Sequence, residues 1–364
     1  MSRRAVSIQD IAREAGVSHA TVSRALHDSH LISSEVRSHI QQLAREMGYT
    51  PNAVAQSLKG QHTNTIGLVV TSIADPYYGR VVRGVEEVAQ RAGLDLFLGV
   101  SNNDPAQEMT VVRSFHRRRV DGIITASSRL SDEQLLELAE YAVPAVLLNR
   151  QSDGQSDLLR SVYVDDYAGA RLAMSHLLEL GHRAIGYAGS SVRPRSNRIR
   201  RQGYLDALAG AGIAVCAGWV QIGAADLRYY TDDVAAGGHL MLEALRAGVT
   251  AVFCYNDMYA VGALMACREL GLDVPGQVSI IGFDGIELAQ YVTPPITTIH
   301  QPKLRLGQLA MEMLLELMEG KPVEDQILLP ELLVRCSTAS ALAVPVKIGP
   351  DTDLSGRLPC TTSN

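Results

Sequence analysis

The fold of the N-terminal region follows from residues 6–26, which read VSIQDIAREAGVSHATVSRAL. Ser7, with Asp10 three residues later, predicts a capping box that begins a helix, and Gly16 ends that helix in a turn. Ser18 can begin a second helix directly after the turn, and a third helix follows from residues 33 or 34 to 47. Three short helices with a glycine turn between the first two predict a helix-turn-helix domain over residues 1–50.

The second of these helices presents mostly short polar side chains on its outward face, where Arg24 is the one long cation. Such a face fits the major groove of DNA, and Arg24 can donate two hydrogen bonds to a guanine edge. The alternative is a three-helix scaffold whose polar face is merely solvated. The helical pattern by itself leaves both interpretations open.

Charge is distributed unevenly along the 364 residues, whose net charge is −6. Residues 1–62 hold seven basic and five acidic residues, whereas the remainder has 34 acidic and 26 basic residues and a balance of −8. A mildly basic N-terminal region followed by an acidic remainder suits binding of an anionic polymer by the N-terminal region. The alternative is that the asymmetry arises by chance.

Targeting and redox features predict a cytoplasmic protein. The N-terminus lacks an apolar signal-peptide core, and no run of 18 apolar residues predicts a membrane span. The five cysteines are widely spaced without a CxxC pair, as expected of reduced thiols. We expect no metal, no cofactor and no membrane contact.

From residue 65 onward, short β-rich runs alternate with amphipathic helices. This alternation predicts parallel sheets covered on both faces, and the strands are too many for one compact sheet, so two similar lobes are expected. The predicted strands are 66–70, 94–100, 122–125, 145–148, 161–164, 184–188, 220–222, 251–254 and 279–281, and predicted helices include 78–91, 132–141, 168–180, 200–211 and 257–270. We place lobe 1 at about 63–163 and 296–325, and lobe 2 at about 164–295 and 326–341.

Polar residues follow several of these strands, where ligands of parallel sheets bind. Carboxylates, an amide, an arginine fork and aromatic faces suit a sugar or another polyhydroxy compound. Capping or turn roles are the alternative for Asp75, Asn256 and Asp284. The predicted ligand-binding residues are Asp75, Tyr78, Arg150, Arg198, Asn256 and Asp284, with Arg198 in the loop that opens the helix after strand 184–188.

Five arginines fall between residues 193 and 201. Some of these arginines are expected to be solvated charges on the surface of a helix. So many arginines close together could also bind an anionic effector such as a sugar acid or phosphate. We therefore keep a neutral sugar and an anionic sugar derivative as equal alternatives, with a nucleobase behind them. Trp219 is expected to pack in the core.

Longer strings of the chain closely resemble the LacI/GalR family: residues 6–26 above, ISSEVRSHIQQLAREMGYTPNAVAQSLKG at 32–60, VDDYAGARLAMSHLLELGHRAIGYAGS at 164–190 and TPPITTIHQP at 293–302. The resemblance spans nearly the whole chain. It implies an α/β fold with an N-terminal helix-turn-helix domain and hinge helix, followed by a two-lobed periplasmic-binding-protein-like sensor domain. It also implies that Asp75, Arg198, Asn256 and Asp284 touch the effector. The family often has a short loop with a stacking aromatic residue where this chain has the longer loop 222–230, in which Tyr229 or Tyr230 would take that place.

The resemblance further implies the residues that contact DNA. His19 and Ala20 would choose operator bases beside Arg24, and short polar residues would hold phosphates. Residues 51–62 match the hinge, in which Leu58 would wedge into the minor groove. This segment is too short and polar to be a stable lone helix, although Leu58 could instead pack on the next domain. The full set is Ser7, Ser18, His19, Ala20, Thr21, Ser23, Arg24, Asn52, Ala55 and Leu58.

We therefore predict a DNA-binding transcriptional regulator, a repressor by expectation, whose operator affinity a small molecule controls. A single helix-turn-helix reads few base pairs, so a homodimer on palindromic double-stranded DNA is expected. Residues 342–364 have no heptads and predict a flexible tail rather than a tetramerisation helix.

Two other functions fit the chain less well. A sugar-binding receptor would leave the first 60 residues unexplained. An enzyme is disfavoured because no GxSxG, HExxH, P-loop or GxGxxG motif is present, and no catalytic residue is proposed.

Overall fold

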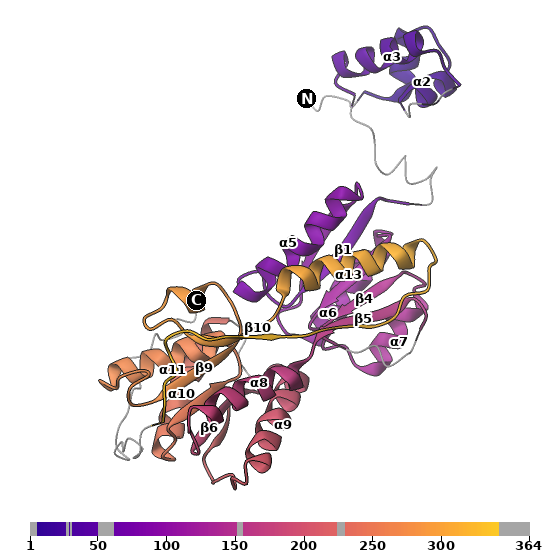
Figure 1. Ribbon diagram of the computed structural model, residues 1–364. Helices are drawn as coiled ribbons and strands as arrows, with labels where there is room; N and C mark the ends of the chain where they lie inside the picture. The colour runs from indigo at the N-terminus through magenta and orange to yellow at the C-terminus, as the bar shows by residue number, and fades with distance from the viewer. Residues whose placement is uncertain are drawn as a thin grey trace. The chain divides into compact units, whose positions relative to one another are not determined.

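The computed structural model describes residues 6–26, 29, 31–49, 62–150, 156–223 and 230–341. The contacts divide the chain into two units, Met1–Thr63 and Asn64–Asn364, which we call the head and the body (Figure 1). Among the described residues, no helix is both long and apolar enough to cross a bilayer.

The head consists of helices α1 (Ile8–Glu14), α2 (His19–Leu26) and α3 (Ser34–Glu46). Ser7 caps α1 through the expected capping box with Asp10, and Gly16 turns the chain at φ 63°. The core of the head comprises Ile11, Ala12, Val22, Ala25, Ile40 and Ala44. The predicted hinge residues 51–59, with Asn52, Ala55 and Leu58, lie outside the described residues, as does the predicted tail 342–364.

Lobe 1 of the body contains a six-stranded parallel sheet in the order β11-β5-β4-β3-β1-β2. Ile66, Leu68 and Val70 of β1 point toward helices α5 and α13, while Val69 points toward α6, as the period of two along a strand requires. The elements are β1 (Thr65–Val70), α5 (Pro76–Arg91), β2 (Asp95–Val100), α6 (Pro105–Arg117), β3 (Gly122–Ala126), α7 (Asp132–Glu140), β4 (Ala145–Leu148), β5 (Leu159–Val164), α13 (Lys303–Met318) and β11 (Gln326–Leu328).

Lobe 2 contains a second six-stranded sheet in the order β12-β10-β9-β8-β6-β7, in which only the β10–β12 pair is antiparallel. Helices α10 and α11 pack together over one face, and α8 and α9 cover the other (Figure 1). The elements are α8 (Asp166–Glu179), β6 (Ile185–Ser190), α9 (Pro194–Gly210), β7 (Val220–Gly223), α10 (Tyr230–Arg246), β8 (Ala251–Cys254), α11 (Asp257–Glu269), β9 (Ser279–Asp284), α12 (Leu288–Tyr291), β10 (Thr297–His300) and β12 (Glu331–Leu333).

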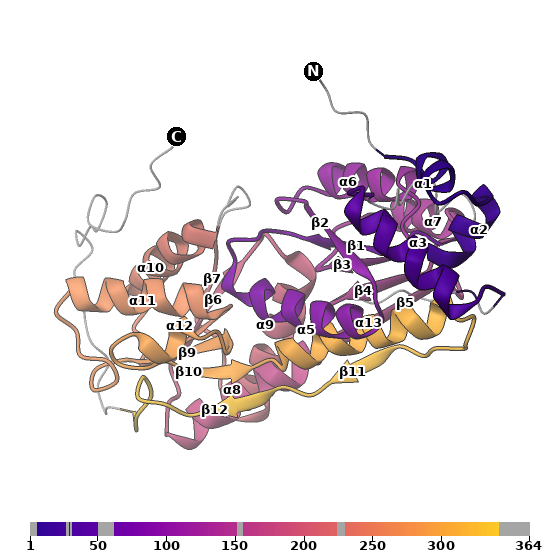
Figure 2. The same cartoon turned by 90° about the horizontal axis from the view of Figure 1, so that it is seen from above.

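The predicted lobe boundaries near 296 and 326 need correction. Strand β10 pairs with β9 and belongs to lobe 2, and β11 pairs with β5 and belongs to lobe 1. The chain therefore crosses between the lobes after β5, after β10 and after β11 (Figure 2). Strands of three or four residues have too little periodicity to reveal which sheet they join, because the partner is chosen by tertiary contacts.

Candidate functional site

A cavity of about 270 Å³ lies between the two lobes. Ligand pockets are commonly about 300–1,000 Å³, so its size is near that of a site for one small molecule. Both lobes contribute its walls: Asn149, Arg150, Tyr163, Val164 and Ile327 come from lobe 1, and Asp165, Asp166, Arg195, Ser196 and Ile199 from the first crossing and from lobe 2.

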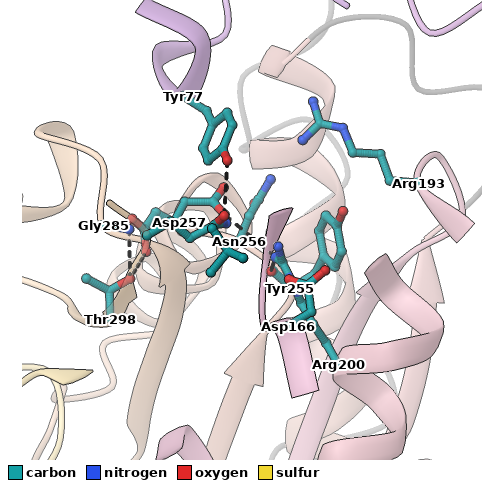
Figure 3. A network of polar contacts seen from close by, with 12 residues as sticks. Tyr77, Asp166, Arg193, Arg200, Tyr255, Asn256, Asp257, Gly285 and Thr298 are labelled. Atoms are coloured by element: carbon teal, nitrogen blue, oxygen red, sulfur yellow. Dashed lines mark hydrogen bonds and ion pairs between the residues drawn. The ribbon is translucent and has the colours of Figure 1, made fainter. Parts of the chain in front are cut away.

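A hydrogen-bond network beside this cavity joins the lobes. The amide of Asn149 donates to the Tyr77 hydroxyl over 2.7 Å, and that hydroxyl donates to Gln301 Oε1 over 3.0 Å. Gln301 Nε2 then donates to Asp284 Oδ1 over 2.6 Å. Tyr77 comes from α5 of lobe 1 (Figure 3). Asp284 comes from the end of β9 in lobe 2, so the network joins the two lobes.

An ion pair also crosses between the lobes. Asp75 caps α5 by accepting from the Tyr77 amide, and its second oxygen accepts from Arg193 over 2.8 Å. Arg193 directly precedes Pro194, the first residue of α9, and its guanidinium lies 5.6 Å from the centre of the Tyr78 ring. The pair places one cation and one anion at the junction of the two lobes.

Arg200 is the most enclosed cation of the network, with 5% of the residue exposed. Its Nε donates to Asp166 over 2.8 Å, and one terminal nitrogen donates to the Tyr255 carbonyl over 2.6 Å and lies 3.7 Å from Asp284. The guanidinium stacks 3.6 Å from the centre of the Phe283 ring. Arg200 therefore orients Asp166 and Asp284 together (Figure 3).

Burial sets the protonation of the acidic groups in this network. It raises the pKa of Asp284 to about 6, against the opposing effect of Arg200. It also raises the pKa of Asp233 to about 6, and Asp233 accepts a 2.8 Å hydrogen bond from the Asn256 amide. Together with the cavity wall, the network holds five carboxyl groups and four guanidinium groups: Asp75, Asp165, Asp166, Asp233 and Asp284 with Arg150, Arg193, Arg195 and Arg200.

Asp257 lies behind the network and is completely buried. It accepts hydrogen bonds from the Ile286 amide and the Thr298 hydroxyl. Burial, followed by nearby Asp284, raises the pKa of Asp257 from 3.8 to about 7. The folded protein thus holds a proton that the unfolded chain releases between those values.

This bound proton predicts a pH dependence of stability for Asp257→Asn. Because the folded state binds more protons than the unfolded state, the contribution of Asp257 to the free energy of unfolding falls as pH rises from about 4 to about 7. Asparagine has no such proton, so the stability of the variant relative to wild type should increase from about pH 5 to about pH 8. Urea unfolding at both pH values measures this. An offset between Asp257→Asn and wild type that stays constant with pH would contradict the assignment.

The structure brings most of the predicted ligand-binding residues to the cleft. Asp75, Asn256 and Asp284 belong to the network, and Arg150 lines the cavity. Asp75 and Asn256 also cap α5 and α11, so their predicted capping roles coexist with their position in the cleft. Tyr78 is 1% exposed and packs in the core of lobe 1, with its ring facing Arg193.

Arg198 is not where the sequence placed it. It lies inside α9 rather than in a loop, and it is exposed. Helix α9 begins at Pro194, six residues earlier than expected, and its buried face contains Asn197, Arg200 and Tyr204, at spacings of three and four. Arg198 falls between these positions and points away from the network.

Several residues of the network were missed by sequence reasoning. The sequence shows the arginine cluster, and a helix that begins at Pro194 would place Asn197, Arg200 and Tyr204 on one face and so select Arg200. Nothing local distinguishes the others. The missed residues are Tyr77, Asp166, Arg193, Arg200, Asp233 and Gln301.

Trp219 packs in the core of lobe 2, as predicted. Tyr229 lies outside the described residues, and the position of the Tyr230 side chain is not among those described.

The predicted DNA-contacting residues gather around α2 of the head. Ser18, His19, Ala20 and Arg24 are exposed, while Ser7, Thr21 and Ser23 are half-buried. The Ser18 hydroxyl accepts from the Thr21 amide over 3.1 Å and caps α2, and the Ser7 hydroxyl donates to Asp10 over 2.6 Å. Ser18, His19 and Ala20 lie at the start of α2, where backbone amides favour anions, and Arg24 lies in its last turn.

Two family models match the chain: "Bacterial regulatory proteins, lacI family" at residues 7–52 and "Periplasmic binding protein-like domain" at residues 174–338. The chain is 38% identical to the HTH-type transcriptional regulator GalS of Salmonella typhimurium, over 85% of this chain and 89% of that protein. It is 36% identical to the HTH-type transcriptional regulator GalR of Escherichia coli, over 92% and 96%.

Solved structures agree with this relationship. The lac repressor dimer bound to operator and an anti-inducer superposes with a TM-score of 0.80 at 28% identity, covering 92% of this chain and 100% of that one. The complex of the transcriptional regulator CelR with cellobiose gives a TM-score of 0.67 at 28% identity, covering 91% and 99%. Both named relatives exceed 30% identity and match over most of each chain. The chain therefore belongs to the lacI family of bacterial regulatory proteins and is a transcriptional regulator.

Proposed function

We propose that this regulator represses transcription from the cytoplasm by binding palindromic operator DNA as a homodimer. A relative of the same fold was solved as a dimer on its operator. The exposed surface of α2, with His19, Ala20 and Arg24, would read bases in the major groove. Asn52, Ala55 and Leu58 would act in the hinge, with Leu58 as the minor-groove wedge.

A neutral polyhydroxy compound, such as a sugar, is the proposed effector. The single observation that supports this is the alternating set of donors and acceptors contributed by both lobes beside one small cavity. The cavity wall and the network together hold five carboxyl groups and four guanidinium groups, so they offer no excess of positive charge to a sugar acid or phosphate. Two relatives were solved with neutral sugars, cellobiose and ribose.

The proposed control of DNA binding follows from the cleft joining the two lobes. An effector that prefers one angle between the lobes shifts the population of that angle. If that angle also favours hinge pairing on the operator, effector and operator affinities become coupled, and the coupling is the same from either side.

The proposal is tested with purified full-length protein in two steps. Sequencing of genomic DNA retained at moderate salt should yield one palindromic motif, and retention without any motif would count against operator recognition. D-ribose, D-galactose and cellobiose should then raise the melting temperature of the body and change operator affinity, whereas gluconate and glucose 6-phosphate should not. A response to the anionic compounds alone would overturn the neutral-effector proposal.

Arg24→Ala should weaken binding to the selected operator by about 1–3 kcal/mol, or about 5- to 150-fold, and relax sequence preference at one base pair of each half-site. The reason is loss of a bidentate hydrogen bond to a base edge. Titrations on the operator and on single-base variants measure this. The control Arg45→Ala removes an exposed arginine of α3 and should leave base preference intact. Equal base preferences in Arg24→Ala and wild type would refute the role of Arg24.

A further inference from the structure

Lys303 is the first residue of α13, and its ammonium group is buried where the chain crosses from lobe 2 to lobe 1. Nζ donates to the backbone carbonyls of Asp284, Gly285 and Gln301, over 2.9 Å to Gly285 and 3.2 Å to Gln301. The three donors of the ammonium group are thereby used. The Asp284 and Gly285 carbonyls belong to the turn after β9 in lobe 2, while α13 packs on α5 in lobe 1. The side chain therefore ties one lobe to the other.

The stability of α13 does not explain a lysine at this position. A cation at the first turn of a helix faces the positive end of the helix dipole, which is unfavourable. Burial is a further cost, and it lowers the pKa of Lys303. The favourable contacts of the ammonium group lie instead in the turn that it holds.

That turn has an unusual backbone. Asp284 has a φ of 109° and Gly285 a φ of 64°. A non-glycine residue at positive φ costs about 1–3 kcal/mol and persists only where its surroundings hold it. Lys303 holds the turn from one side through two carbonyls. Thr298 accepts from the Gly285 amide over 3.3 Å, and Asp257 accepts from the Ile286 amide over 2.8 Å (Figure 3).

The strained residue, Asp284, also contributes one of the carboxylates of the cleft. Asp284 accepts from Gln301 and lies 3.7 Å from Arg200, so its side-chain direction depends on the backbone angle that Lys303 holds. We propose that Lys303 is a positioning residue that sets the Asp284 carboxylate in the cleft and transmits its ligand-dependent shifts to α13 and α5 of lobe 1. This inference rests on the proposed effector function of the cleft.

The test compares Lys303→Met with wild type as full-length proteins, with Lys321→Met as the matched control, since Lys321 is an exposed lysine beyond the end of α13 that pairs with Glu319. Amide hydrogen exchange reports opening of the turn independently of any sugar. In Lys303→Met the Gly285 and Ile286 amides should exchange at least about 10-fold faster, while the α13 amides of residues 307–317 exchange as in wild type. Unchanged exchange at the turn, or equal acceleration throughout α13, would overturn the positioning role.

The second measurement uses whichever of D-ribose, D-galactose and cellobiose stabilises the wild type most. The factor by which this sugar changes operator affinity should fall to about 1 in Lys303→Met. Lys303→Arg, which keeps a buried cation with several donors, should restore part of the response. A full response in Lys303→Met would overturn the transmission role.

The outcomes separate this inference from the proposed function. If no sugar affects the wild type, the proposed effector class fails, and the exchange measurement still decides whether Lys303 positions the turn. If Lys303→Met does not fold, Lys303→Gln keeps two donors, and the same exchange comparison applies to it.

Discussion

Replacing Arg200 by methionine is expected to lower the free energy of unfolding of the body by about 3–5 kcal/mol, the usual cost of removing one partner of a buried ion pair. Asp166 would lose a 2.8 Å hydrogen bond, and Asp284 would lose its nearest guanidinium. Methionine retains similar apolar volume against Phe283, so the loss comes mainly from the uncompensated carboxylates. The same variant should lose the sugar response, because both carboxylates are then free to turn away from the cleft.

Arg198→Met is the matched control in the same helix. Arg198 is exposed, so its replacement should change stability by less than about 0.5 kcal/mol and leave the sugar response intact. Urea unfolding of both variants, with melting curves in the presence of the stabilising sugar, makes the comparison. A larger loss in Arg198→Met than in Arg200→Met would show that the inward face of α9 has been misassigned.

Gly307→Ala is expected to destabilise lobe 1 by about 3 kcal/mol, at the upper end of the usual cost of overpacking. Helices α5 and α13 lie side by side in both views of the fold (Figures 1 and 2) and approach closely through Gly84 and Gly307. A Cβ atom on Gly307 would lie 2.1 Å from the Val81 carbonyl oxygen. Since the obstacle is backbone, the helices must move apart, which also disturbs the crossing at Lys303.

Gly79→Ala in α5 provides the opposite expectation for the same chemical change. A Cβ atom there meets nothing within 4 Å, so the lower backbone entropy of the unfolded alanine chain should stabilise the protein by about 0.5–1 kcal/mol. Thermal unfolding of the two variants measures the difference. Similar effects of both substitutions would mean that glycine is not required for the contact between α5 and α13.

The head and the order of elements could be predicted from the sequence because their determinants are local. The hydroxyl of Ser7 and the carboxyl of Asp10 cap α1 within four residues, and Gly16 ends it because glycine tolerates positive φ. The central strands are continuous apolar runs, such as 66–70 and 251–254, which mark strands buried on both faces whatever their partners are. The resemblance to the LacI/GalR family rests on the same contiguous strings.

Only the tertiary structure decided which polar residues meet in the cleft and which sheet each short strand joins. Arg193 and Arg200 rather than Arg198 face inward because α9 starts at Pro194, and a change of one or two positions along a helix turns a side chain to another face. The sequence assigned β10 to lobe 1 and β11 to lobe 2, and the structure has the reverse, because β10 pairs with β9 and β11 pairs with the distant strand β5. In the sequence nothing distinguishes Lys303 from any other lysine at the start of a helix. Its contacts with the turn at Asp284 are visible only in the folded structure. Local chemistry thus determined the elements, whereas long-range packing determined the site, because the site is assembled from residues more than 200 positions apart, such as Tyr77 and Gln301.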